Sequence, residues 1–203
     1  MHNKGMLMIL SGPAGSGKDT VLASVYKLMP DMVQSVSMTT RAPREGEKDG
    51  VDYYFVSHEC FESAIKENKM LEYAQYGVNY YGTPKEAVDR MLNEGKIVVL
   101  KIEVQGARNI RNIYPDAISI FITPPNMSVL EHRLRKRGTE SDEDIERRLK
   151  IAADELSNIN EYDYIVINDE LENAVNDVKT IISAEKLKIS RRNNIISEVK
   201  NYV

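Results

Sequence analysis

A glycine-rich loop between an apolar strand and a helix, near the start of the sequence, leaves few folds open to this chain. The run Leu7–Leu10 is continuously apolar, which is typical of a strand buried on both faces. The loop after it has the spacing G-x-x-x-x-G-K, whose glycines permit turns in which successive backbone N–H groups face one anion at the positive end of the next helix. The sequence therefore predicts phosphate binding by Gly12, Pro13, Ala14, Gly15, Ser16, Gly17 and Lys18.

Further along the chain, apolar runs of strand type alternate with helical patterns. This alternation favours an α/β fold of the P-loop NTPase type, in which helices flank a mostly parallel sheet. Each expected core strand is short and nearly all apolar, so it should be covered on both faces. These strands are Leu7–Leu10, Lys96–Glu103, Ile118–Thr123 and Tyr164–Asn168.

Capping residues mark the expected helix boundaries. Thr83 is expected to cap a helix that has Pro84 in its first turn and that stops at Gly95. Three further helices are expected. One runs from Ser57 to about Lys66, one begins at Ser141, and one runs from about Glu170 to about Lys188.

Residues 35–83 interrupt the alternation, because they are rich in Thr, Arg, Tyr and short extended segments. We interpret them as an inserted lobe that carries substrate specificity. The core domain is then expected to comprise residues 1–34 and 84–203, with a short lid at about residues 137–144. No repeat and no Pro/Gly/Ser-rich linker divides the sequence.

Composition narrows the partners and the compartment. The 31 acidic residues exceed the 27 basic ones, giving a net charge of −4, which disfavours nucleic acid as a partner. Local basic clusters suit a small anionic ligand instead.

Cys60 is the single cysteine, so an internal disulfide is excluded, and we interpret it as a packed apolar side chain. No run is apolar enough for a signal or membrane segment, and we expect a cytoplasmic monomer or homodimer without a membrane partner.

The inserted lobe contains a second group of anion-binding residues. Arg41 and Arg44 lie three apart in a loop and can converge on one phosphate, with a tyrosine hydroxyl completing the site. The alternative is a basic turn that packs against acids such as Glu47.

Here the sequence resembles the guanylate kinase family. The match to the family's loop motif is unbroken from Thr39 through Val56, and the resemblance covers nearly the whole chain. It continues in the segments 35–37, 71–74, 79–83, 102–106, 133–138 and 167–169. The resemblance implies an enzyme of purine nucleotide metabolism that transfers a phosphoryl group from ATP to GMP, and to dGMP, with Mg²⁺.

The resemblance also implies roles for individual residues. The phosphate of GMP is expected at Arg41, Arg44, Tyr53 and Tyr81, with Glu47 in the same site, and guanine at Ser37, Glu72, Thr83 and Glu103. The chemistry of guanine agrees, because its adjacent N1–H and N2–H₂ donors suit a carboxylate and its O6 accepts from a hydroxyl, whereas adenine lacks the 2-amino donor. Arginines of the lid region are expected over the ATP phosphates, and two residues at a strand end near the adenine. These residues are Arg133, Arg137, Arg148, Asn168 and Asp169.

Arg133 and Arg137 lie four apart and share a helical face, so both can stabilise charge on the transferring phosphoryl group together with Lys18, Arg41 and Arg148. The alternative is a surface face paired with Glu140, Asp142 and Glu143.

The expected metal site departs from the family pattern. Asp19 follows Lys18 where the motif has Ser or Thr, and Thr20 comes one step later on another side of the helix. Lys101 stands two residues before Glu103, where the family usually has an acid. We hypothesise a charge exchange in which Asp19 joins the metal shell or pairs with Lys101.

Two other functions remain open from the sequence. One is a non-catalytic module with the same fold that recognises a phosphorylated peptide through Arg41, Arg44 and Tyr53. The intact Lys18 argues against it. The other is a related kinase that acts on a different phosphorylated small molecule, which the guanine-reading residues disfavour.

Overall fold

The computed structural model describes residues 5–136, 138 and 141–192. The chain divides into two compact units, which we describe separately. One contains residues 5–10 and 31–119, and the other contains residues 11–30 and the chain from 120 onward. Within the described ranges, no helix combines the length and the apolar character needed to cross a bilayer.

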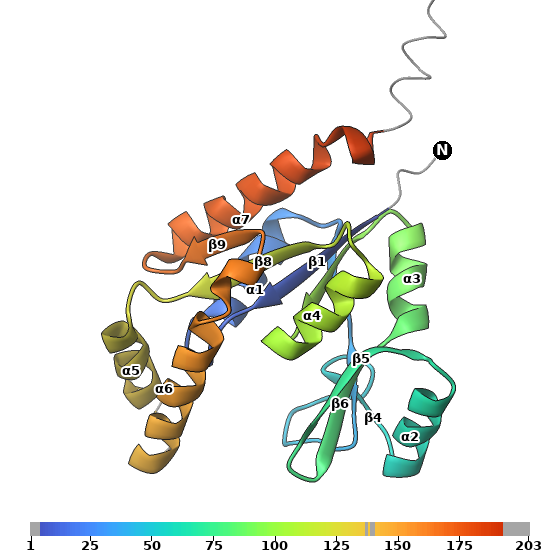
Figure 1. Ribbon diagram of the computed structural model, residues 1–203, viewed down its shortest axis with the longest axis horizontal. Coiled ribbons are helices and arrows are strands. Elements are labelled where there is room, and N and C mark those ends of the chain that lie inside the picture. Colours follow the sequence, from blue (N-terminus) through green and yellow to red (C-terminus); the bar gives the residue numbers. More distant parts are fainter. Residues whose placement is uncertain (1–4, 137, 139–140, 193–203) are drawn as a thin grey trace, which may run out of the picture. The chain divides into compact units, whose positions relative to one another are not determined.

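The first unit contains a parallel sheet segment in which β7 pairs with β1 on one side and β2 on the other. Strand β1 and helices α3 and α4 of this unit are labelled in Figure 1. The side chains of β1 and the first four of β7 are buried, as expected for strands covered on both faces. Helix α3 packs against β7, and Gly95 adopts a positive φ of 77° just beyond its end, as predicted. The elements are β1 (Met6–Ser11), β2 (Met32–Gln34), α3 (Lys85–Asn93), β7 (Ile97–Lys101) and α4 (Val104–Ile113).

A second sheet in the same unit has the order β4-β3-β6-β5. Strands β5 and β6 form an antiparallel hairpin, whereas β3 pairs parallel with β4. Helix α2 contacts β6, where Phe61 stacks on Tyr80 with ring centroids 5.3 Å apart. Ser57 caps this helix through a hydrogen bond from the Cys60 N–H, as predicted. The elements are β3 (Ser37–Thr39), β4 (Tyr53–Phe55), α2 (His58–Lys66), β5 (Met70–Tyr76) and β6 (Asn79–Pro84).

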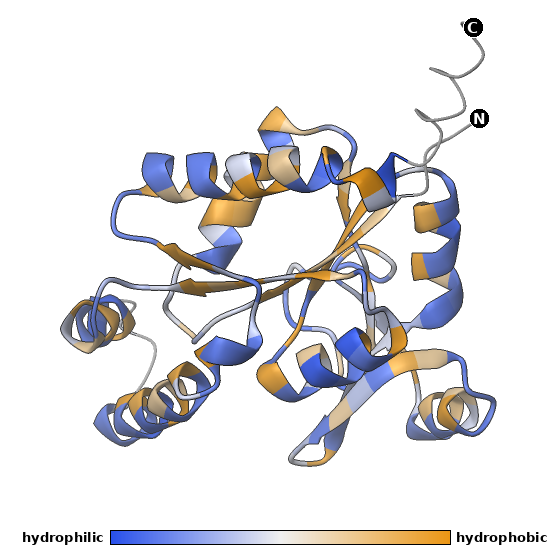
Figure 2. Ribbon diagram, turned by 45° about the horizontal axis from the view of Figure 1, so that its top comes forward, coloured by the Kyte–Doolittle hydropathy of each residue, from blue (hydrophilic) through white to orange (hydrophobic). Residues whose placement is uncertain are grey.

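The other unit pairs β8 with β9 in parallel, and α7 packs against both β9 and α1. Ser141 caps α6 as predicted, by accepting a hydrogen bond from the Asp144 N–H. In Figure 2 strands β8 and β9 are hydrophobic along most of their length, whereas helix α7 alternates between hydrophobic and polar residues. The elements are α1 (Lys18–Leu28), β8 (Ile118–Thr123), α5 (Met127–Lys136), α6 (Asp142–Leu156), η1 (Ile159–Glu161), β9 (Tyr164–Ile167), α7 (Leu171–Lys186) and η2 (Ile189–Arg191).

The parallel strand pairs and their flanking helices confirm the predicted α/β class, but three local predictions were wrong. Thr83 does not cap α3, whose N-cap is Pro84, because its hydroxyl is used elsewhere. Strand β9 is not buried on both faces, since Ile165 and Ile167 are each about half exposed. Cys60 is exposed rather than packed, because it lies in the first turn of α2 on the solvent side. The predicted lid falls partly on residues 137, 139 and 140, which lie outside the described residues.

Candidate active site

The glycine-rich loop turns sharply between β1 and α1. Gly12, Gly15 and Gly17 have φ values of 148°, 89° and 83°, a region that side chains with a Cβ rarely adopt. A Cβ on Gly12 would lie 2.0 Å from the Ile122 carbonyl oxygen, so that position also tolerates no side chain. All three glycines therefore serve backbone conformation, and Gly12 serves close packing as well.

Residues far along the chain hold this loop in place. The Asn168 amide, buried at the end of β9, donates to the Ser16 carbonyl at 2.8 Å. The Arg133 guanidinium donates to the same carbonyl at 3.4 Å and to the Asn168 carbonyl at 2.9 Å. A Cβ on Gly17 would come within 2.3 Å of the Asn168 amide nitrogen. Asn168 and Arg133 thus contact the loop itself.

Lys18 and Asp19 begin helix α1 directly after the loop. The Lys18 ammonium lies 3.4 Å from the Pro13 carbonyl oxygen, so its side chain reaches back across the loop. Asp19 is exposed, and so is Thr20. The pKa of Tyr26 is raised by burial and then by the negative charge of Asp19, which places that carboxylate near the tyrosine.

The helix pair α5–α6 supports the loop through an apolar cluster. Leu130 and Leu134 are fully buried and pack with Ile145 and Ala152 of α6. A Cβ on Gly15 would meet both leucine side chains at about 3 Å, which shows how closely α5 approaches the loop. The packing explains why Arg133, on the same helix, reaches the loop.

Asp142, one of the acids that the alternative interpretation placed beside Arg133, pairs with another arginine. Arg135 pairs with Asp142 and with Glu131, which ties the end of α5 to the start of α6. Arg133 instead binds main-chain carbonyls of the loop region. Arg148 is half-buried on α6, and Arg137 lies outside the described residues.

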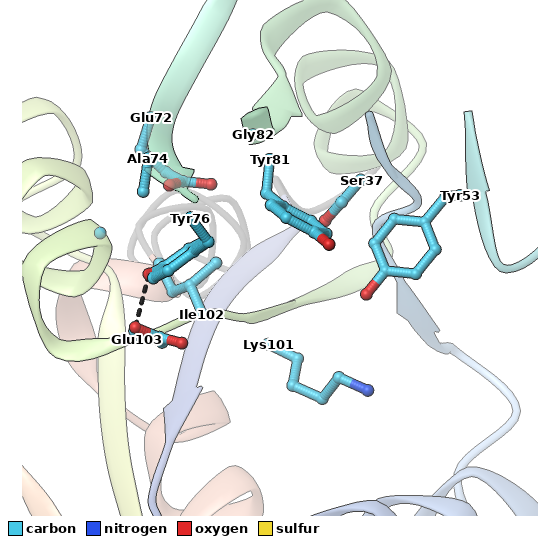
Figure 3. A pocket seen from close by; sticks show the side chains of 11 residues that line it. Ser37, Tyr53, Glu72, Ala74, Tyr76, Tyr81, Gly82, Lys101, Ile102 and Glu103 are labelled. Atoms are coloured by element: carbon cyan, nitrogen blue, oxygen red, sulfur yellow. Dashed lines mark hydrogen bonds between the residues drawn. The ribbon is translucent and has the colours of Figure 1, made fainter. Parts of the chain in front are cut away.

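The first unit holds a cavity of about 340 Å³ that gathers five of the residues predicted to bind GMP. Figure 3 shows Glu72 and Glu103 on one side of the view and the hydroxyls of Ser37, Tyr53 and Tyr81 on the other. The lining also includes an ammonium group, that of Lys101. The cavity therefore has an acidic end and an end rich in hydrogen-bond donors. Its lining residues are Ser37, Tyr53, Glu72, Ala74, Tyr76, Tyr81, Gly82, Lys101, Ile102, Glu103 and Gly106.

Glu72 is the buried acid of this cavity, with 8 % of its surface exposed. The Thr83 hydroxyl donates to its Oε1 at 2.6 Å, and Gly106 lets Oε2 approach helix α4, since a Cβ there would lie 3.0 Å away. Burial raises the pKa of Glu72, the Thr83 hydrogen bond opposes that rise, and the charge of Glu103 adds to it. A buried carboxylate with an unfavourable charged form is suited to a ligand that donates hydrogen bonds.

Aromatic rings connect the cavity with the arginine loop. Tyr53 and Tyr81 meet edge to face with centroids 6.0 Å apart, and Tyr81 meets Tyr76 at 5.7 Å. The Arg41 guanidinium lies over the ring of Tyr53, 5.5 Å from its centroid. Arg41 therefore lies beside the donor-rich end of the cavity, although it is not among the lining residues.

Arg41 forms a bidentate ion pair with Glu47, with N···O distances of 2.8 and 2.9 Å. Glu47 also accepts a hydrogen bond from the Arg44 N–H at 2.7 Å. The hydrogen bonds from Arg41 lower the pKa of Glu47 most, and the one from Arg44 lowers it further. The hydrogen bonds that Arg41 donates to Glu47 raise the pKa of Arg41; partial burial opposes this rise, and the interaction with Tyr81 adds to it. Because a carboxylate repels phosphate, we interpret Glu47 as the residue that orients Arg41 rather than as a ligand contact. Arg44 is exposed.

Comparison with known proteins identifies the family of this chain. A family model described as "Guanylate kinase" matches residues 4–185. The chain belongs to the guanylate kinase family. A guanylate kinase of Listeria monocytogenes is 52 % identical over 192 residues, covering 94 % of each chain. One of Latilactobacillus sakei is 49 % identical over 204 residues, covering 100 % of this chain and 99 % of that protein.

A solved structure supports the same assignment. The crystal structure of guanylate kinase from Anaplasma phagocytophilum matches with a TM-score of 0.76 and 34 % identity, covering 94 % of this chain and 90 % of that chain. Membership therefore rests on sequence and fold over nearly the full length. It makes this chain a nucleotide-binding kinase by family, with the cavity and the glycine-rich loop as its candidate sites.

Sequence reasoning about the family motif missed some of the cavity residues. Tyr76, Ile102 and Gly106 line the cavity but were not among the predicted site residues. Tyr76 lies just beyond the motif segment 71–74, and the signal that could have found it is strand alternation, which places it on the same face as Glu72 and Ala74 and places Tyr73 on the other. For Gly106, a glycine within a helix is the one signal that could have indicated close packing.

Proposed function

We propose that this chain transfers the γ-phosphoryl group of ATP to GMP, and to dGMP, by direct in-line attack of the GMP phosphate oxygen. The observation that carries the proposal is the cavity in which buried Glu72 lies opposite the hydroxyls of Tyr53 and Tyr81. An acid at one end and donors at the other match a nucleotide with a guanine base and a phosphate. Phosphoryl transfer needs positioned charges rather than a covalent intermediate, and no nucleophile–base pair is invoked.

The acidic end is suited to guanine. The Glu72 carboxylate, held by Thr83, can accept from N1–H and N2–H₂ of the base, and the hydroxyl of Ser37 can donate to O6. Adenine has no 2-amino donor and would leave a buried carboxylate incompletely bonded, which is costly. This mismatch supports GMP over AMP as the acceptor.

The donor-rich end is suited to the phosphate of GMP. Tyr53 and Tyr81 contribute hydroxyls, and Arg41 contributes a guanidinium that Glu47 already orients. Arg44, which is exposed in the same loop, is proposed as a second guanidinium for the same phosphate. Oriented guanidinium groups lose less rotamer freedom on binding an anion than mobile ones do.

The glycine-rich loop is proposed to hold the phosphates of ATP, with Lys18 beside them and Arg133 and Arg148 stabilising the transferring group. Asp169, which follows β9, is proposed near the adenine, while Asn168 holds the loop. No cluster of three or more His, Cys, Asp or Glu suited to a metal occurs among the described residues. The exposed Asp19 fits a Mg²⁺ that is held mainly by substrate phosphates and one protein carboxylate. When bound, Mg²⁺ would neutralise charge on the phosphates.

A coupled assay of ADP formation tests the proposed function. ADP is expected to form from ATP and GMP far faster than from ATP and AMP or CMP. Equal rates with all three acceptors would favour a related kinase with another substrate. ATP-independent binding of a phosphorylated peptide without ADP formation would favour a non-catalytic module.

Asp19 and Lys101 provide a prediction about the metal. If Asp19 contributes to the metal shell, Asp19→Asn is expected to raise the Mg²⁺ concentration needed for half-maximal turnover by about fivefold, since one charged ligand is lost. Lys101→Asp is expected to lower that concentration by adding a carboxylate. A magnesium titration of turnover measures both, and turnover of the unchanged protein without any divalent cation would refute the role of Asp19.

The raised pKa of Glu72 predicts the pH dependence of GMP binding. Guanine needs the carboxylate form, so affinity should fall as pH drops through a pKa that lies above the ordinary value of 4.5. The phosphate of GMP also titrates, at about pH 6, and its effect on affinity should be the same for every variant of the protein. Calorimetric titration of Glu72→Gln between pH 4.5 and 7.5 is therefore the control: its affinity should follow the phosphate alone. Identical pH profiles for both proteins would contradict the prediction.

A further inference from the structure

Tyr76 connects the two ends of the cavity. It is the last residue of β5, and its hydroxyl donates to Oε2 of Glu103 at 2.5 Å (Figure 3). Its ring meets Tyr81 edge to face at 5.7 Å. One side chain thus contacts a residue proposed to bind the phosphate and a residue proposed to bind the base.

Glu103 needs such a contact more than Glu72 does. Glu72 is buried and is held by Thr83 and by packing against Gly106. Glu103 is exposed and immediately precedes helix α4, where its side chain makes no capping hydrogen bond. An exposed glutamate samples several rotamers unless a partner fixes it, and fixing it costs side-chain entropy. The Tyr76 hydroxyl supplies that partner.

The repulsion between the two acids makes the orientation matter. The charge of Glu103 contributes to the raised pKa of Glu72, so the carboxylates lie close enough to interact. A donor on Glu103 reduces that repulsion and draws its carboxylate toward the end of β5. Strand β5 packs against α4, so the strand that ends at Tyr76 lies against the helix that begins directly after Glu103.

We propose that Tyr76 is a positioning residue that fixes Glu103 for recognition of the 2-amino group of the acceptor base. The inference rests on the proposed function and names a specificity residue of the same site. Tyr76 acts through Glu103 and does not take part in the transfer of the phosphoryl group. Its loss should therefore weaken GMP binding and reduce the preference for GMP over IMP, which lacks the 2-amino group.

Tyr76→Phe tests this, because it keeps the ring against Tyr81 and removes the hydroxyl. Calorimetry without ATP is expected to show GMP affinity weakened by about fivefold, the net worth of one typical intramolecular hydrogen bond, with IMP affinity changed less than twofold. In assays of turnover, KM for GMP should rise by a similar factor, with kcat and KM for ATP unchanged. In a Glu103→Ala background, Tyr76→Phe should have no further effect on GMP affinity.

Tyr73→Phe is the matched control, because Tyr73 is an equally exposed tyrosine on the same strand and does not line the cavity. It should leave GMP affinity unchanged. Equal GMP affinity for Tyr76→Phe and the unchanged protein, or an undiminished effect in the Glu103→Ala background, would overturn the inference alone. Absence of GMP binding by the unchanged protein would overturn the proposed function and this inference together.

Discussion

Lys18→Met is expected to lower kcat/KM by about a hundredfold to a thousandfold, the cost of removing one preorganised charge that acts on the transition state. Methionine keeps the length and the apolar stem of lysine, so the loop should stay folded. Its glycines, Asn168 and Arg133 would still hold its conformation after loss of the long contact between the ammonium and the Pro13 carbonyl. GMP affinity should not change, because the acceptor cavity contains no part of the loop.

Steady-state kinetics and GMP calorimetry on the same preparation measure both effects. Lys27→Met is the matched control, since Lys27 is an exposed lysine in the last turn of the same helix. It is expected to leave both quantities within about twofold. An Lys18→Met protein that retains more than a tenth of the original kcat/KM would contradict the proposed role of the ammonium.

Glu72→Gln is expected to reduce kcat/KM for GMP by about a hundredfold. Hydrogen bonds to a charged group are worth about 1.5–3 kcal/mol each, and guanine would lose a charged acceptor for adjacent donors. The glutamine amide would also direct its own N–H₂ group at those donors. Thermal stability should hold or rise slightly, because the amide oxygen can still accept from Thr83 and a buried ionisable group is removed.

Kinetics with GMP and IMP, together with thermal unfolding, separate recognition from folding. IMP should be affected less than GMP, because it presents one donor fewer to the carboxylate. Glu62 is an exposed acid on α2, so Glu62→Gln is the matched control. It should change neither kcat/KM for GMP nor the thermal stability. A Glu72→Gln protein that keeps its stability and its original kcat/KM for GMP would exclude Glu72 from base recognition.

Much of the architecture followed from local pattern. The strands around Leu7–Leu10 and Ile118–Thr123 were predicted because a run buried on both faces must be almost wholly apolar. The caps Ser57 and Ser141 were predicted because a hydroxyl there satisfies orphan N–H groups of the first turn. Such signals lie within a few residues of each other, so no tertiary contact is needed to detect them.

The prediction that failed at Thr83 shows where local reasoning ends. Thr83 precedes Pro84 as a good cap would, but its hydroxyl donates to Glu72, eleven residues earlier in the chain. The demand of a buried carboxylate for a donor outweighs that of a helix terminus open to water. The prediction that β9 is buried on both faces also failed because of tertiary packing. Helix α7 covers one of its faces, and Ile165 and Ile167 on the other face are half exposed.

By itself the sequence determined the strand–loop–helix unit for phosphate, the α/β class and the family, because each depends on residue types at fixed short spacings. Only the tertiary structure decided that Arg133 and Asn168 hold that loop, that Glu47 orients Arg41, and that Tyr76 binds Glu103. Arg41 and Glu47 share one loop, but the other partners come from different elements that are far apart in the chain. Spacing in the sequence carries no information about which donor will meet which acceptor until folding brings them within hydrogen-bond distance.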